Sequence, residues 1–142
     1  MKQWCKLKTF LGKNSAERWL ICEAIMLLGF ARIIVLTVPI RLMAPWISRS
    51  PETESCDEAL LVRVRKAVTT AARNVPWNAV CLPQALAAKA MLARRGCGAA
   101  FHLGATRDAE GKLNAHAWLV AGGTIVVGAV GMDGMSPLAR FG

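Results

Sequence analysis

The hydrophobic pattern of this chain changes once, at Gly96, and that change constrains the fold more than any other feature. Before Gly96 the apolar residues recur every three or four positions, as in helices. After Gly96 they alternate over short stretches separated by turn residues, as in strands. With 142 residues the chain is long enough for one core of ordinary size. This order predicts an α+β fold in which helices precede a small sheet.

The most apolar segment, residues 19–47, raises the question of a membrane segment. Its uninterrupted apolar runs on either side of Arg32 are short. A membrane span needs about 20 residues, and we expect Pro39 to end the helix before that length is reached. Glu23 and the lack of a clear cleavage site argue against a signal peptide. We therefore expect packed or interfacial helices, with membrane insertion or targeting as the alternatives.

Basic residues are concentrated in the same part of the chain. Of the net charge of +9, residues 1–50 carry +6, from eight Lys or Arg and two acidic residues. A basic segment suits an anionic membrane surface, nucleic acid or an acidic peptide, but no run of alternating basic and aromatic residues is present, so we expect no nucleic acid partner. The polar stretch "SRSPETESCDE" that follows predicts a linker. We therefore divide the chain into a basic, apolar helical arm (1–50) and a core (51–142), together one structural unit.

Two helices are predicted in the core before the strands. Ser55 and Glu58 form a capping box, which marks the start of the first helix. The second helix lies within residues 75–96 and tolerates Pro83 only in its first turn. It is apolar on nearly every face, so we expect it to run through the middle of the core with Cys81 at its N-terminus. The first helix has one apolar face, formed by Leu60, Val64, Ala67, Val68 and Ala71.

Three short strands are predicted after the second helix. They lie within "AAFHLGAT", "LNAHAWLV" and "TIVVGAV". The turn signals between them are short, so we expect an antiparallel meander.

The cysteine pattern indicates the redox environment. Five cysteines form an odd number without a CxxC pair, which favours a reducing cytosol in which one cysteine is chemically special and the others are small hydrophobic residues. A zinc site of Cys81, Cys97, His102 and His116 is conceivable, but its spacings of 16, 5 and 14 residues match no common ligand pattern. We therefore expect no metal.

Cys81 and one histidine are the candidates for chemistry. A thiolate is a nucleophile, and the amides of a helix N-terminus both stabilise its negative charge and can donate to an oxyanion. A base must take the thiol proton, and histidine is the natural choice. The chain has two histidines, His102 and His116, and the pattern alone does not separate them.

Four motifs, in order, resemble one known family. They are "CLPQALAAKAMLARRG", "FHLGAT", "LNAHAWLVAGGTIVVG" and "SPLARF", within residues 60–142. The chain resembles the B proteins of lasso-peptide biosynthesis, which are leader peptidases with a transglutaminase-like fold. The resemblance implies a papain-like core, made of a central helix and a small antiparallel sheet, after the helical arm of the stand-alone peptidase form.

The resemblance also implies site residues. Cys81 corresponds to the nucleophile and His116 to its base, which leaves His102 a structural residue. The family completes its triad with an aspartate near the end of the next strand, where this chain has Gly128. Asp133, the only acidic residue after His116, is the candidate third member, and a backbone carbonyl is the alternative.

The sequence leaves open the roles of three further residues. Trp118 follows His116 by two residues and either walls the site or belongs to the core. Trp77 and Asn78, just before Cys81, either line the substrate cleft or shape the approach to the helix.

The function that the resemblance implies is a cytoplasmic cysteine peptidase that removes the leader of a lasso-peptide precursor without cofactor or metal. Its partners are then the precursor peptide, a separate leader-recognition (RRE) protein and an ATP-dependent lasso cyclase. The surplus apolar surface of residues 19–47 is a docking area for one of these or for a membrane surface. The alternatives are a thiol-dependent acyl transferase of the same fold and a catalytically silent scaffold that holds the cyclase at a membrane.

Overall fold

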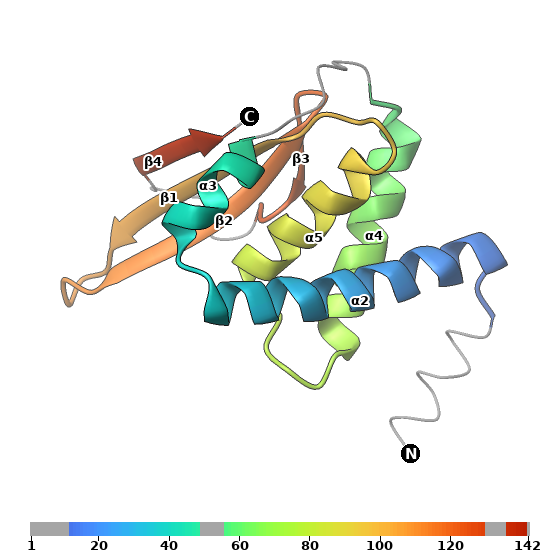
Figure 1. Cartoon of the computed structure of the whole chain (residues 1–142), viewed down its shortest axis with the longest axis horizontal. Helices are drawn as coiled ribbons and strands as arrows, with labels where there is room; N and C mark the ends of the chain where they lie inside the picture. The colour runs from blue at the N-terminus through green and yellow to red at the C-terminus, as the bar shows by residue number, and fades with distance from the viewer. Residues whose placement is uncertain (1–11, 49–55, 130–135, 142) are drawn as a thin grey trace.

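The structure is a computed structural model that describes residues 12–48, 56–129 and 136–141. Helices come first in the chain and strands follow, as the change of pattern predicts (Figure 1). The described elements are α2 (Ser15–Thr37), α3 (Ile40–Ser48), α4 (Glu58–Asn74), α5 (Cys81–Ala93), β1 (Ala100–Arg107), β2 (Leu113–Ala121), β3 (Thr124–Val127) and β4 (Ser136–Phe141).

Helix α5 lies at the centre of the fold. Helices α2 and α4 pack against it, and so do strands β2 and β3 (Figure 1). Most residues of α5 are buried, which confirms the central helix predicted from its uniformly apolar sequence. Pro83 lies in the first turn, where its missing N–H breaks no helical hydrogen bond because the first amides of a helix have no acceptor within it.

The sheet has four antiparallel strands in the order β3-β2-β1-β4. Strands β1, β2 and β3 form the predicted meander, with Gly122 and Gly123 at positive φ in the tight turn between β2 and β3. Strand β4 was not predicted, because "SPLARF" has no alternating pattern and contains Pro137. It pairs with β1 at the edge of the sheet, a position where proline is tolerated.

Helix α2 ends directly before Pro39, as predicted, but it is longer than expected. It begins at Ser15 and has 23 residues, so it is long and apolar enough to cross a bilayer by length and composition. The expectation of a helix shorter than a membrane span is therefore wrong. One face of α2 packs against α4 and α5 and belongs to the common hydrophobic core; its buried residues are Leu20, Ile21, Ala24, Leu28 and Ala31.

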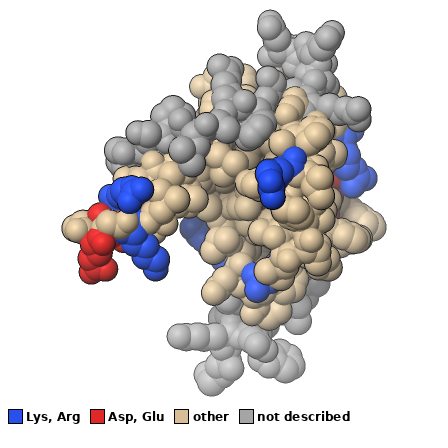
Figure 2. All heavy atoms as spheres, turned by 60° about the vertical axis from the view of Figure 1, so that its left-hand side comes forward, with Lys and Arg blue, Asp and Glu red and all other residues tan. Residues whose placement is uncertain are grey.

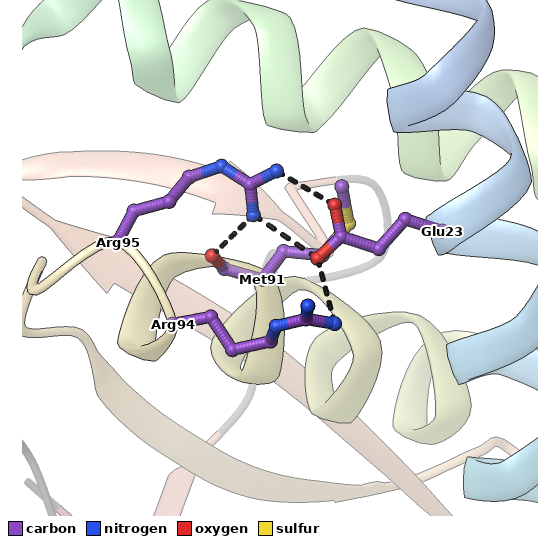
Figure 3. A network of polar contacts seen from close by, with 4 residues as sticks. All are labelled: Glu23, Met91, Arg94 and Arg95. Atoms are coloured by element: carbon purple, nitrogen blue, oxygen red, sulfur yellow. Dashed lines mark hydrogen bonds and ion pairs between the residues drawn. The ribbon is translucent and has the colours of Figure 1, made fainter.

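An ion-pair cluster fastens α2 to the end of α5 (Figure 3). Arg95 donates to the two carboxylate oxygens of Glu23 over 3.1 and 2.6 Å and to the carbonyl oxygen of Met91 over 2.8 Å. Arg94 adds a second cation 3.3 Å from Glu23. The hydrogen bonds that Arg95 donates to the Glu23 carboxylate raise the pKa of Arg95. The acidic residue inside the apolar sequence of α2 is thus neutralised.

Helix α4 starts later than predicted. Its N-cap is Asp57, whose carboxylate accepts a hydrogen bond from the Ala59 N–H over 3.1 Å. The predicted capping box is wrong, because Glu58 is the first helical residue instead of the third, and Ser55 lies outside the described residues. The apolar face is confirmed at Val64, Ala67, Val68 and Ala71, with Leu61 more deeply buried than Leu60.

A disulfide joins Cys56, before α4, to Cys97, after α5, with the Cα atoms 5.4 Å apart. The prediction that both are small free hydrophobic residues is therefore wrong. The two cysteines are 41 residues apart in sequence, and only the packing of α4 beside α5 brings them together. Cys22 and Cys81 carry free thiols.

Candidate active site

Cys81 is the first residue of α5 and is partly exposed. The N-cap, Val80, supplies no side-chain hydrogen bond, and its carbonyl accepts from the Gln84 N–H over 3.3 Å. The first amides of a helix have no acceptor within it, and Pro83 has no N–H. The Cys81 and Leu82 N–H groups are therefore the free backbone donors of this turn. The predicted position of Cys81 at a helix N-terminus is confirmed.

His116 lies on β2 and is half-buried. Its Nε2 atom lies 2.8 Å from the carbonyl oxygen of Gly128. A carbonyl oxygen only accepts hydrogen bonds, so Nε2 carries the proton in this contact. In the neutral ring Nδ1 is then unprotonated and available as a base.

One pocket of about 250 Å³ brings the two candidates together. Cys81 lines it from the start of α5 and His116 from β2. Arg65 is the charged residue among the others; the remaining lining residues are Thr69, Gln84, Val126, Val127, Gly128 and Ala129. His102 does not line this pocket. The pocket therefore brings together a thiol and a histidine whose Nε2 atom contacts the Gly128 carbonyl.

The family comparison agrees with this arrangement. A family model described as the transglutaminase-like superfamily matches residues 24–140. The chain belongs to the transglutaminase-like superfamily. Members of the superfamily are typically cysteine proteases or acyltransferases, so the chain belongs to a group of cysteine-dependent enzymes, and the predicted α+β fold class is confirmed. No curated protein and no solved structure matches the chain.

In this transglutaminase-like domain Gly128 lies at the position where the motif resemblance implies an aspartate. Gly128 has φ +86°, and a Cβ atom there would lie 2.5 Å from the Ala117 carbonyl oxygen and 2.8 Å from Trp118 Cα. Only glycine allows so close an approach to β2. Asp133, the candidate third triad member, lies outside the described residues and stays a prediction.

Aromatic rings flank the base. Trp118 is buried, with its ring centroid 6.4 Å from that of His116 and 5.4 Å from that of His102. Trp118 is not among the residues that line the pocket, so the structure favours the core reading, with the indole beside the ring of the candidate base. His102 is the cross-strand partner of Trp118 in the pairing of β1 with β2, and its ring stacks on the indole.

Trp77 and Asn78 shape the approach to α5. Trp77 packs near Gly29 of α2, where a Cβ atom would lie 3.8 Å from the indole. The Asn78 carbonyl accepts a hydrogen bond from Arg32 over 3.0 Å. Neither residue lines the pocket, so the structure favours the second of the two readings.

The four residues considered for zinc are not assembled in the transglutaminase-like domain. Cys97 is bonded to Cys56, and within the described ranges no group of three or more His, Cys, Asp or Glu side chains is placed to hold a metal ion.

Three pocket residues were not predicted as functional. Arg65 and Thr69 lie one helical turn apart on α4, a helix for which the sequence predicts only an apolar packing face. Gln84 follows Cys81 by three residues on α5 and donates to the Ala79 carbonyl over 2.6 Å. The spacing of Gln84 from Cys81 is a signal that could have placed it beside the thiol.

Proposed function

We propose that the protein is a cysteine peptidase that removes the leader peptide from a lasso-peptide precursor, with Cys81 as nucleophile and His116 as base. The observation that carries the proposal is the shared pocket, in which the first residue of α5 and a histidine with Nε2 bonded to Gly128 face the same space. The resemblance of the motifs after residue 60 supports the choice of substrate. Asp133 remains the candidate for a further group that orients the ring.

The first half of the reaction forms an acyl-enzyme. His116 Nδ1 takes the proton from Cys81 Sγ, and the thiolate attacks the carbonyl carbon of the scissile peptide bond. The tetrahedral intermediate collapses when the C–N bond breaks. The leaving amine of the core peptide takes the proton that Nδ1 received from Cys81. The leader is then held as a thioester on Cys81.

The start of α5 stabilises the charge that develops during attack. The Cys81 and Leu82 amides lie at the free end of the helix, where the helix dipole also favours negative charge. An oxyanion that receives both hydrogen bonds is stabilised more than the neutral carbonyl before it. The same turn thus presents the nucleophile and the donors.

The second half of the reaction releases the leader. His116 Nδ1 takes a proton from water, and the resulting hydroxide attacks the thioester carbonyl. The C–S bond then breaks to give the carboxylic acid of the leader, which loses its proton to solvent, and the Cys81 thiolate, which takes the proton from Nδ1. These steps require no metal or organic cofactor. If an amine replaces water, the same thioester leads to acyl transfer, the second activity of this superfamily.

Mass spectrometry of a lasso precursor incubated with the protein and a leader-recognition protein tests the proposal. We compare wild type with Cys81→Ala, His116→Ala and Cys22→Ala, the last being an exposed free cysteine outside the pocket. Leader release by wild type and Cys22→Ala, and its loss in the other two with unchanged circular dichroism, is the expected result. Equal cleavage by all four proteins contradicts the proposal and favours a scaffold for the cyclase.

Two additions separate the finer alternatives. Incorporation of an added amine into the leader, in place of a free carboxylate, would identify an acyl transferase. Asp133→Asn tests the third triad member: retained cleavage assigns the orientation of the ring to the Gly128 carbonyl, and lost cleavage adds Asp133 to the site.

A further inference from the structure

The outer surface of α2 and α3 is rich in exposed apolar side chains. Of twelve large hydrophobic residues that are exposed in the described part of the chain, nine belong to these two helices. The other three, Val62, Val80 and Leu113, are scattered over α4, the approach to α5 and the start of β2. Such a concentration on one surface marks an interaction site.

Helix α2 has two apolar faces. One packs on α4 and α5, and the opposite face is formed by Trp19, Met26, Phe30 and Ile33, whose spacings of seven, four and three residues place them on one stripe. Met26, Phe30 and Ile33 are 63%, 59% and 59% exposed. The stripe runs about 21 Å along the helix, at 1.5 Å per residue. A solvated helix of a soluble protein normally carries charges on this face.

An apolar groove continues this surface onto α3. It has a volume of about 350 Å³ and lies between Phe30 and Ile34 of α2, Leu42 and Trp46 of α3, and Leu86 of α5. Every residue that lines it is apolar. The side chains of the groove offer no hydrogen-bond partner to a polar ligand, so the groove suits hydrocarbon chains.

The charge around this surface is positive. The described residues 12–48 hold four Lys or Arg and two acidic residues, a net charge of +2, and Arg41 is exposed directly beside Leu42. The carboxylate of Glu23 is neutralised by Arg94 and Arg95 (Figure 3). On the face drawn in Figure 2, Lys and Arg are scattered over a largely uncharged surface, and most of the acidic side chains gather at one projecting end. Basic residues beside apolar ones are attracted to anionic lipid head groups.

We propose that the outer surface of α2 and α3 binds an anionic lipid bilayer, with α2 lying in the plane of the membrane. Trp19 and Trp46 are exposed on α2 and α3, and tryptophan is the side chain preferred at the boundary between lipid and water. Because the opposite face of α2 is packed on α4 and α5, crossing the bilayer would expose Leu28 and its neighbours and remove α2 from the core. The helix therefore binds the membrane from one side.

Co-flotation of the full chain with vesicles tests this inference independently of any enzymatic activity. The vesicles contain equal parts of phosphatidylcholine and phosphatidylglycerol. We expect the protein to float with them, to bind less at high salt because screening weakens the attraction, and to be released by alkaline carbonate, which does not extract a spanning helix.

Matched variants locate the surface. Met26→Gln with Ile33→Gln removes two exposed apolar side chains from the stripe. Because the bilayer no longer buries these two side chains, we expect partitioning to weaken at least tenfold, an estimate that follows from the free energy of burying such side chains. Val62→Gln with Leu113→Gln removes two exposed apolar side chains elsewhere and is expected to leave partitioning unchanged. Circular dichroism and light scattering verify the fold and the oligomeric state of each variant.

Four results would overturn the inference. The first is absence of flotation, and the second is equal flotation of the two double variants. The third is retention of the protein on the vesicles in carbonate, which indicates a spanning helix. The fourth is a lipid-free oligomer that the Met26 and Ile33 changes dissociate without changing flotation, which identifies a second copy of the chain as the occupant.

Discussion

The Nε2 atom of His116 lies 2.8 Å from the carbonyl oxygen of Gly128, so a backbone group orients the candidate base. The contact depends on the absence of a side chain at position 128, because a Cβ atom there would meet the backbone of Ala117 and Trp118. Gly128, which stands where the motif resemblance implies an aspartate, thus supplies a hydrogen-bond acceptor through its backbone.

Gly128→Ala is expected to lower kcat/KM for leader release about a hundredfold, because displacement of the carbonyl misplaces the imidazole. Nitrogen NMR of the His116 ring should show that Nε2 no longer holds the proton in one defined tautomer. Gly123→Ala is the matched control, since Gly123 also has a positive φ (+76°) but nothing lies within 4 Å of its Cβ position. An equal loss in both variants would attribute the effect to backbone strain.

Lys89 predicts a pH dependence of stability. It is 4% exposed on α5, its Nζ donates to the Ala99 carbonyl over 2.8 Å, and burial lowers its pKa from 10.5. Between the lowered pKa and 10.5 the unfolded chain binds more protons than the folded chain, so the free energy of unfolding contributed by this residue rises with pH. Below that window both states are protonated and this contribution is flat.

Urea unfolding at a series of pH values measures this dependence. Lys89→Met removes the titrating group while keeping a long side chain, so it should lack the rise. The same rise in wild type and variant would assign it to other groups.

Reduction of the disulfide between Cys56 and Cys97 is expected to lower the free energy of unfolding by about 4 kcal/mol. The estimate follows from the chain entropy released when a loop of 41 residues is opened. Denaturant unfolding with and without a reductant measures the change. The double variant Cys56→Ala, Cys97→Ala should show the lower stability in both conditions; a further loss on adding reductant would contradict this origin.

Glu23→Gln should lower the free energy of unfolding by about 1–3 kcal/mol, because it leaves the partly buried Arg95 guanidinium without its carboxylate. Arg94→Gln is the control. Its side chain is 67% exposed, so its ion pair should contribute at most about 1 kcal/mol. Thermal or urea unfolding of both variants makes the comparison. Because Glu23→Gln removes both ion pairs and Arg94→Gln removes one, equal losses would show that the Arg95 pair adds nothing to stability.

The helices and the meander were predictable because their signals are local. The apolar face around Val64 and Val68, the position of Pro83 in a first turn and the alternation of β2 are properties of neighbouring residues. Predictions failed where a competing nearby residue or a distant partner determines the start of a helix or the formation of a strand. Asp57, two residues after the predicted N-cap Ser55, caps α4, and β4 is a strand only because it pairs with β1.

The sequence by itself determined the order of elements, the change from helix to strand and the place of Cys81 at a helix N-terminus, since periodicity and proline geometry act within a few residues. The motif resemblance implied that His116, and not His102, is the base, and the tertiary structure places His116 at the pocket of Cys81. Only the tertiary structure decided that Cys56 meets Cys97. It also decided that the Gly128 carbonyl accepts from His116. These contacts join residues far apart in the chain, and a backbone carbonyl is the same in every residue, so no sequence pattern reports them.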